Sequence, residues 1–176
     1  LPLVEQGADL IGLLDSAGDF FYLSPNTARI LGYRPEDLHN KKAFDLIHPD
    51  DLERVEMVWS KVLSCREKQE VIFRYKTASG NWIWMETSAC NYLHNPNIRG
   101  IAITSNDISQ RIEKNIELER SKKQYKALFE NNSDLVYYQD SDGYILDINA
   151  AVTEVYGLSK ESVINKHTSI FIAPDK

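Results

Sequence analysis

The side chains in this sequence that could carry chemistry are its histidines, cysteines and grouped carboxylates. They are His39, His48, His94, His167, Cys65, Cys90 and acids such as Asp15, Glu36, Asp50 and Asp51. One histidine suffices as an axial haem ligand, which makes His39, His48 and His94 candidates. His48 is the most suggestive, although a local hydrogen bond at the turn it occupies is the simpler role. The two cysteines lack the spacing of a metal site or a redox pair.

Catalysis within these residues is not indicated. The acids each have a local structural use, because aspartate favours turns and acids favour the first turn of a helix. The sequence contains no nucleophile with a base at motif spacing and no glycine loop that would cradle phosphate. We therefore expect a segment that is not itself an enzyme.

The predicted elements that would position these groups lie before and after one polar stretch of the sequence, residues 107–130. It contains no Gly or Pro and is rich in good helix formers, which predicts one helix of about 22 residues. Asp107 can cap its start, with Gln110 three residues on, as in a capping box. Asn115 and Lys122 interrupt any heptad. A solvated spacer and a signalling element both remain open.

The chain repeats itself across this helix, at a shift of 125 residues and without a gap. Glu5, Asp9, Leu10, Asp15, Ser16, Gly18, Gly32, Glu36, Asn40, Lys41, Pro49 and Asp50 recur as Glu130, Asp134, Leu135, Asp140, Ser141, Gly143, Gly157, Glu161, Asn165, Lys166, Pro174 and Asp175. So long a period indicates a tandem domain. Lys176 aligns with Asp51, so we expect a piece of a longer protein whose second copy is truncated.

The truncated copy would lack the sheet against which its apolar residues pack. These residues are Leu135, Val136, Ile145, Ile148, Val155, Ile170 and Phe171. Exposed edges and apolar patches recruit other chains. We expect residues 131–176 to be ordered by another chain or by the first copy, or to be the least stable region.

Composition excludes several classes of protein. Hydrophobic residues make up 43% of the chain, enough for a core, but no apolar run is long enough to span a membrane. The net charge of −6 argues against a nucleic-acid surface. The free thiols suit a reducing compartment, so a cytoplasmic location is expected.

Local patterns predict an α+β fold for residues 1–108. We expect strands at 9–15, 19–23, 70–78, 82–92 and 101–106, short helical pieces at 25–31, 34–38 and 43–47, and a longer helix from Pro49 or Asp50 to about Ser64. Ser24 would cap the first helix with Pro25 at its first position, and Gly32 would end it. This order predicts a five-stranded antiparallel sheet with short helices on one face and a C-terminal linker helix.

These marks together resemble the PAS domain family. Asp15-x-x-Gly18, Ser24-Pro25-Asn26, Leu31-Gly32-Tyr33, His48-Pro49-Asp50-Asp51, Phe73-Arg74-Tyr75, Gly80-x-Trp82-x-Trp84 and Asp107-Ile108 occur in the family's order and spacing. The resemblance covers residues 1–108 as a complete PAS domain, 109–130 as a signalling helix and 131–176 as the N-terminal half of a second PAS domain. Within the family, the sequence is most similar to the subgroup that contains a His-Pro-Asp-Asp motif.

The resemblance implies a sensory role, often in bacterial histidine kinases of two-component and phosphorelay systems. Ligand or partner binding would act through the helix on a downstream output domain of the same chain, with self-association and no membrane insertion in this segment. The alternative is a docking or dimerisation scaffold that binds no ligand, within a cyclase or transcription regulator.

The family resemblance also implies a pocket between the sheet and the helices. The candidate lining residues are Phe21, Leu23, Ile30, Leu31, Phe44, Ile47, Val58 and Tyr75. They either line a small-molecule site or simply fill the core. Light-sensing relatives carry a cysteine where this chain has residues 40–43 without one. No histidine recurs at the same place in the two copies, because Ala173 aligns with His48 and His167 aligns with Lys42. We therefore expect neither flavin nor haem.

Overall fold

The structure is a computed structural model that describes residues 9–39 and 41–171. The chain forms two compact units, 1–114 and 115–176, and each is described by itself. The dividing point lies inside the long helix, so the segment 109–130 is shared between the two units. No helix in the described part of the chain is long and apolar enough to cross a membrane.

The first unit is built on one five-stranded antiparallel sheet. Its strands are β1 (Leu10–Leu14), β2 (Phe20–Leu23), β3 (Gln69–Lys76), β4 (Trp82–Asn91) and β5 (Ile101–Asp107), in the order β2-β1-β5-β4-β3. The first and last strands of the unit therefore lie side by side at its centre, while β2 and β3 form the edges. The predicted α+β architecture is confirmed.

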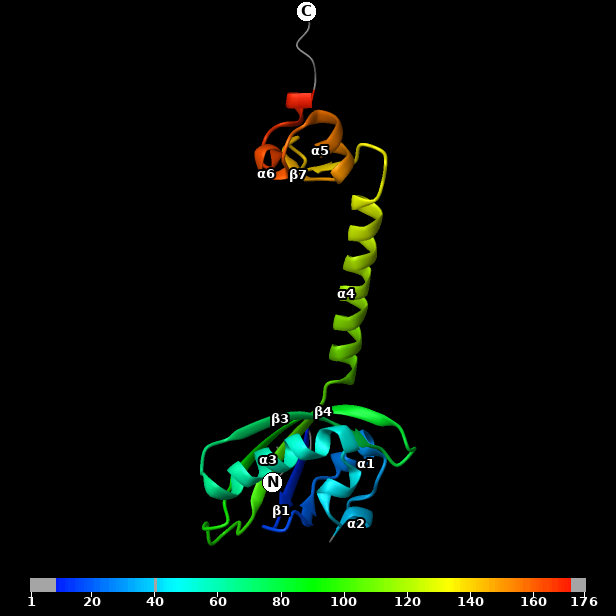
Figure 1. Cartoon of the computed structure of the whole chain (residues 1–176). Coiled ribbons are helices and arrows are strands. Elements are labelled where there is room, and N and C mark those ends of the chain that lie inside the picture. Colours follow the sequence, from blue (N-terminus) through cyan, green and yellow to red (C-terminus); the bar gives the residue numbers. More distant parts are fainter. Residues whose placement is uncertain (1–8, 40, 172–176) are drawn as a thin grey trace, which may run out of the picture. The chain divides into compact units, whose positions relative to one another are not determined.

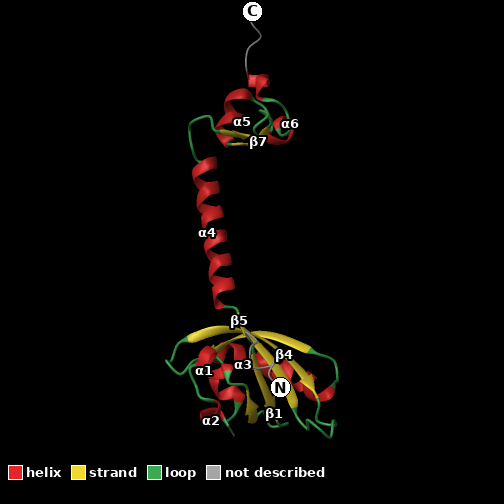
Figure 2. Ribbon diagram, turned by 180° about the vertical axis from the view of Figure 1, so that it is seen from behind, coloured by secondary structure: helices red, strands yellow, loops and turns green. Residues whose placement is uncertain are grey.

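The helices of this unit gather on one face of the sheet (Figure 2). They are α1 (Asn26–Leu31), α2 (Pro35–Leu38), the 3-10 helix η1 (Ala43–Leu46) and α3 (Pro49–Ser64). Gly32 ends α1 in the left-handed region, as predicted, at a φ of 75°. The predicted Ser24 cap is wrong, because Pro25 is the N-cap and the Ser24 Oγ accepts a hydrogen bond from the Ile11 N–H instead.

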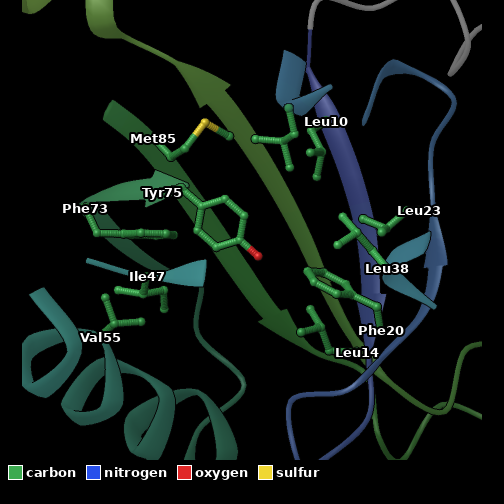
Figure 3. Close-up of a cluster of buried hydrophobic side chains, with 11 residues drawn as sticks. Leu10, Leu14, Phe20, Leu23, Leu38, Ile47, Val55, Phe73, Tyr75 and Met85 are labelled. Atoms are coloured by element: carbon green, nitrogen blue, oxygen red, sulfur yellow. The ribbon is translucent and has the colours of Figure 1, made fainter. Parts of the chain in front are cut away.

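The core of the first unit lies between the sheet and these helices. Strand alternation sends Met85, Thr87 and Ala89 of β4 inward, while Trp84 and Glu86 take the opposite face. The buried apolar side chains come from β1, β2, β3 and β4 and from the helices opposite them (Figure 3). The two layers that the sequence predicts are thus joined by one hydrophobic core.

The long helix α4 spans Ser109–Glu130, close to the predicted bounds (Figure 1). Its start differs from a capping box, because Asp107 still belongs to β5 and its Oδ1 accepts the N–H of Ser109. Apolar residues are spread around the helix, and Ile116, Leu118 and Leu128 remain exposed. This distribution agrees with the missing heptad.

The second unit repeats the opening of the first. It contains β6 (Tyr137–Gln139), β7 (Ile145–Ile148), α5 (Ala150–Tyr156), α6 (Lys160–Val163) and the 3-10 helix η2 (Thr168–Phe171). Asp140 Oδ1 accepts the N–H groups of Asp142 and Tyr144. Asp15 Oδ1 in the first unit accepts those of Ala17 and Asp19 in the same way. The sequence repeat therefore includes the same hydrogen bonds at this turn.

Candidate functional site

The candidate site is a cavity of about 80 Å³ inside the core of the first unit. It lies between the inward face of the sheet and the side chains of η1 and α3. Its lining comprises Leu10, Leu14, Phe20, Leu31, Ala43, Phe44, Ile47, Val55, Val58, Trp59, Val62, Val71, Phe73, Tyr75, Met85, Thr87, Ala89, Ile103 and Ser105. None of these side chains carries a charge at neutral pH, so the cavity suits apolar or weakly polar contents.

Five of the eight predicted lining residues surround this cavity: Leu31, Phe44, Ile47, Val58 and Tyr75. Leu23 is buried and Ile30 half-buried; both belong to the surrounding core without lining the cavity. Phe21 is misplaced in the prediction, because its neighbour Phe20 takes the inward position.

An irregularity in the β1–β2 pairing explains the error at Phe21. Leu13 pairs with Tyr22 but Leu14 pairs with Phe20, so Phe21 is the extra residue of a bulge. Its ring lies against Gly100, where an added Cβ would approach the Phe21 ring to 2.6 Å. The bulge places Phe21 among the exposed aromatic residues, and a strict alternation from the sequence cannot anticipate it.

The polar groups of the cavity are few. The Tyr75 hydroxyl is buried and has no hydrogen-bond partner, and burial raises the pKa of this phenol far above its ordinary value. It therefore stays protonated, so its O–H is available to donate a hydrogen bond. The hydroxyls of Thr87 and Ser105 lie 2.7 Å apart and bond to each other. Tyr75 is thus the one lining side chain within the described residues whose buried polar atom lacks a partner.

The strands that wall the cavity also hold the beginning of α4. Met85, a lining residue, pairs with Asp107 across β4 and β5. The next backbone group, the Trp84 N–H, donates to Ser109 Oγ at 2.9 Å, and the Trp84 carbonyl accepts the Ile108 N–H at 2.9 Å. The residue that bonds the first residue of α4 is therefore the direct neighbour of a residue that lines the cavity.

A second contact joins β4 to the first turn of the helix. Arg111 Nη2 donates to Glu86 Oε1 at 2.9 Å on the outward face of the sheet. This ion pair is exposed, and such pairs contribute little stability. It nevertheless orients the first turn of α4 with respect to β4.

The segment from His48 to Asp51 has a structural role, because it bonds to the edge strand β3. Arg74 donates from its backbone N–H and its Nε to Asp51 Oδ2, both at 2.9 Å, and its carbonyl accepts the His48 N–H at 2.9 Å. Arg54 bonds the carbonyl of Ile72. These bonds occupy backbone groups that an edge strand otherwise presents to other chains.

His48 has the local role that we favour over haem ligation. Its Nδ1 accepts the Asp50 N–H at 3.3 Å, and its ring centroid lies 4.6 Å from that of Trp82. His48 does not line the cavity, nor do His39 and His94. Within the described ranges, no group of three or more His, Cys, Asp and Glu could hold a metal ion.

The remaining motif residues shape turns and the helix junction. Gly18 and Gly80 adopt φ values of 86° and 87° in turns. Trp84 lies under the Arg74 guanidinium, 5.4 Å from ring centroid to Cζ. Asp107 begins the junction with α4. The motif therefore maintains the scaffold, whereas the lining residues are predictable from the faces of the elements and from the family resemblance.

Comparison with protein families gives two matches that follow the repeat. A family model described as the PAS fold matches residues 20–103. A second model with the same description matches residues 123–176. The two matched segments lie one after the other along the chain, as the two units do.

Curated relatives match about half of this chain. White collar 2 protein of Neurospora crassa is 28% identical over 85 residues, which are 48% of this chain and 16% of that protein. Blue light receptor lreA of Aspergillus flavus is 32% identical over 85 residues, 48% of this chain and 10% of that protein. This chain therefore spans only a small part of the length of either relative.

Solved structures share the fold at low sequence identity. A PAS domain from Colwellia psychrerythraea has a TM-score of 0.54 at 20% identity and covers 60% of this chain and 91% of that one. The PAS domain of an HTR-like protein from Haloarcula marismortui has a TM-score of 0.52 at 21% identity, covering 60% and 86%. The PAS-B domain of Drosophila melanogaster Cycle with bound ethylene glycol has a TM-score of 0.51 at 13% identity, covering 56% and 98%.

Proposed function

Because the chain carries two PAS-fold segments in tandem, we propose that it is a signal-transduction segment in which occupancy of the first unit's cavity acts on α4. The observation that carries the proposal is the short path from the lining to the helix. Met85 lines the cavity, and the adjacent Trp84 holds Ser109 and Ile108. A molecule that displaces β4 or β5 therefore biases the direction in which α4 leaves the sheet.

The output of this segment belongs to the rest of the parent protein. We assign it to a bacterial protein histidine kinase of a cytoplasmic two-component or phosphorelay system. The segment itself contributes no catalysis in this assignment. Self-association through α4 is part of the proposal, since Ile116, Leu118 and Leu128 are exposed along it.

A docking module that binds no ligand is the second candidate. The exposed aromatic side chains of Phe21, Tyr22 and Trp82 favour it, because exposed apolar groups on a sheet are candidates for contact with a partner. A parent protein of the cyclase or transcription-regulator class would suit this alternative. The two candidates differ in which face of the sheet controls the output.

Two alanines on adjacent strands separate the candidates. Ala89 lines the cavity, whereas Ala102 occupies a position of opposite alternation on β5. In the parent protein, Ala89→Leu fills the cavity and should fix the output at one level whatever the signal, while Ala102→Leu should leave regulation intact. The reverse result, with Ala102→Leu changing the output and Ala89→Leu neutral, establishes the docking module. Thermal unfolding of both variants verifies that each is folded.

Cofactor content is a separate proposal. We assign neither haem nor flavin to the segment, which is supported by a cavity of about 80 Å³ without a histidine in its lining. The purified chain should be colourless. A Soret band or a flavin spectrum at stoichiometric level would contradict this assignment. Native mass spectrometry of the same sample measures any retained small molecule and the oligomeric state together.

A further inference from the structure

The unpartnered hydroxyl of Tyr75 is the feature of the cavity that points to a particular ligand chemistry. Tyr75 lies on β3 and is 6% exposed, with its ring edge-on to that of Phe73 at 5.9 Å. Its hydroxyl points into the centre of the buried cluster, toward the side of Phe20 (Figure 3). Buried polar groups in folded proteins are nearly always hydrogen-bonded, so an orphan of this kind needs an explanation.

Tyr33 shows what an ordinary tyrosine does in the same unit. Its hydroxyl is part-buried and donates to the Thr77 carbonyl at 3.1 Å. Tyr75 has no such acceptor within the described residues. Burial keeps the Tyr75 phenol protonated by raising its pKa, and nearby Tyr33 and Asp45 raise it further. The O–H donor of this protonated phenol is therefore left without a hydrogen-bond acceptor.

The rest of the lining restricts what else the ligand can be. No lining residue is charged, so a carboxylate, phosphate or ammonium group would lose its hydration without compensation. A water molecule needs two to four polar partners, and the Thr87 and Ser105 hydroxyls already bond to each other. A cavity of about 150 Å³ holds benzene in a known case, so 80 Å³ suits a molecule of about three to five non-hydrogen atoms.

We propose that the cavity takes a small uncharged molecule with one hydrogen-bond acceptor, and that the Tyr75 hydroxyl donates to that acceptor. A ketone, an ether or an alcohol of this size has the required chemistry. The proposal rests on the proposed function, because it names the ligand class of the same cavity. It adds a specificity-determining residue, Tyr75, which packing alone does not require.

The test uses the full chain with acetone as the probe. The chain has two methionines: Met85 lines the cavity and is 2% exposed, while Met57 is 57% exposed and serves as an internal control. In protein labelled with ¹³C at the methionine methyl groups, acetone should shift the Met85 signal saturably and leave that of Met57 unchanged. Tyr75→Phe should weaken this binding about five- to tenfold, the usual effect of losing one hydrogen bond. Tyr33→Phe should leave it unchanged.

Xenon distinguishes a missing hydrogen bond from Tyr75 from a cavity that binds no small molecule at all. It fills apolar voids and accepts no hydrogen bond, so wild type and Tyr75→Phe should bind it equally at Met85. Equal acetone affinity for wild type and Tyr75→Phe overturns the role of Tyr75 but leaves a binding cavity. A Met85 signal that responds to neither probe overturns both this inference and cavity occupancy. A crystal structure with an ordered water alone on the Tyr75 hydroxyl in saturating acetone also overturns it.

Stability gives an independent measurement. An unpartnered buried hydroxyl is costly, so Tyr75→Phe should raise the melting temperature of the ligand-free chain by a few degrees. The same substitution at Tyr33 removes a satisfied hydrogen bond and should lower it. A lower melting temperature for Tyr75→Phe would show that the hydroxyl already has a partner, which contradicts the inference.

Discussion

Asp51 is the single residue on which the β3 edge most depends. Its side chain is 8% exposed and accepts bonds from Arg74 and Arg54 at 2.9 Å. Asp51→Asn removes the charge and replaces one of the two acceptor oxygens by an NH2 donor, so we expect a loss of about 3 kcal/mol in the free energy of unfolding. Urea unfolding at neutral pH measures it.

Asp50 is the matched control for that substitution. It bonds the same guanidinium at 3.2 Å, but its side chain is 70% exposed. Exposed ion pairs contribute about 0–1 kcal/mol, so Asp50→Asn should have a small effect. Equal losses for the two variants would mean that the edge strand depends on net charge rather than on the buried contact.

The pH dependence of stability follows from the same carboxylate. The hydrogen bond from Arg74 holds the pKa of Asp51 well below its usual range, against the opposing effect of burial. A carboxyl with a lowered folded-state pKa stabilises the fold above the unfolded-state value of about 3.9 and loses this contribution as pH falls below it. The stability difference between wild type and Asp51→Asn should be constant from about pH 7 to pH 5 and shrink toward pH 3. A difference that persists undiminished at pH 3 contradicts this explanation.

Among the structural elements, the junction between β4 and α4 is the first test of coupling. Ser109 Oγ is the acceptor for the Trp84 N–H, and Ser109→Ala removes it. We expect faster hydrogen exchange at the Trp84 amide and a loss of about 1 kcal/mol. Ser121→Ala, an exposed position in the same helix, should change neither. Unchanged exchange at Trp84 in Ser109→Ala would mean that a water replaces the hydroxyl without cost.

The rotational phase of α4 is the second test at this scale. Each helical residue turns the chain by about 100°, so two residues inserted after Glu119 rotate the downstream part of the chain by about 200°. Seven inserted residues nearly restore the phase, with a drift of about 20°. In the parent protein the first insertion should lock or abolish the output, and the second should keep it regulated. Near-normal regulation with both insertions would show that α4 is a passive spacer between the two units.

The elements themselves were largely predictable, and the errors come from contacts with other strands. The Asp15 turn, Gly32 and the strand from Trp82 follow from short-range chemistry that the sequence displays directly. Phe21 was misassigned because a bulge shifts the β1–β2 register by one residue. Whether a strand contains a bulge depends on its partner, and the partner is not visible in a local pattern.

The contacts that join the elements were less predictable, because they connect residues far apart in the chain. Asp51 looked like a helix-start residue, and its partner Arg74 lies on a strand 23 positions later. Arg74 stands between the buried aromatics Phe73 and Tyr75 on an edge strand, a signal that could have prompted a search for an acid. The orphan hydroxyl of Tyr75 has no sequence signal, since tyrosines in cores usually find a partner.

At the scale of the whole molecule, the two units have cores of different size. The first unit has eleven buried residues in its main cluster, from Leu10 to Met85. Among the residues described up to 171, the cluster of the second unit has four, Ile145, Ile148, Val152 and Val163. Its two-stranded sheet leaves Leu135, Val155 and Ile170 exposed. A hairpin with a small core is marginally stable on its own, although α4 adds the stacked pair Tyr125 and Phe129 beside Tyr138.

Hydrogen exchange should therefore divide the chain at α4. Amides of β7 that bond within the second unit, such as Ile145 to Lys166, should exchange much faster than those of β4 and β5, because local opening costs less where fewer apolar contacts are lost. The measurement belongs in a sample that is monomeric by native mass spectrometry. If residues 131–176 are as protected as 70–107 in that monomer, the four-residue core is sufficient and the expectation of a weak second unit is wrong. If protection appears only at concentrations where the chain self-associates, a second copy stabilises this unit, and its exposed apolar residues are the surface to substitute next.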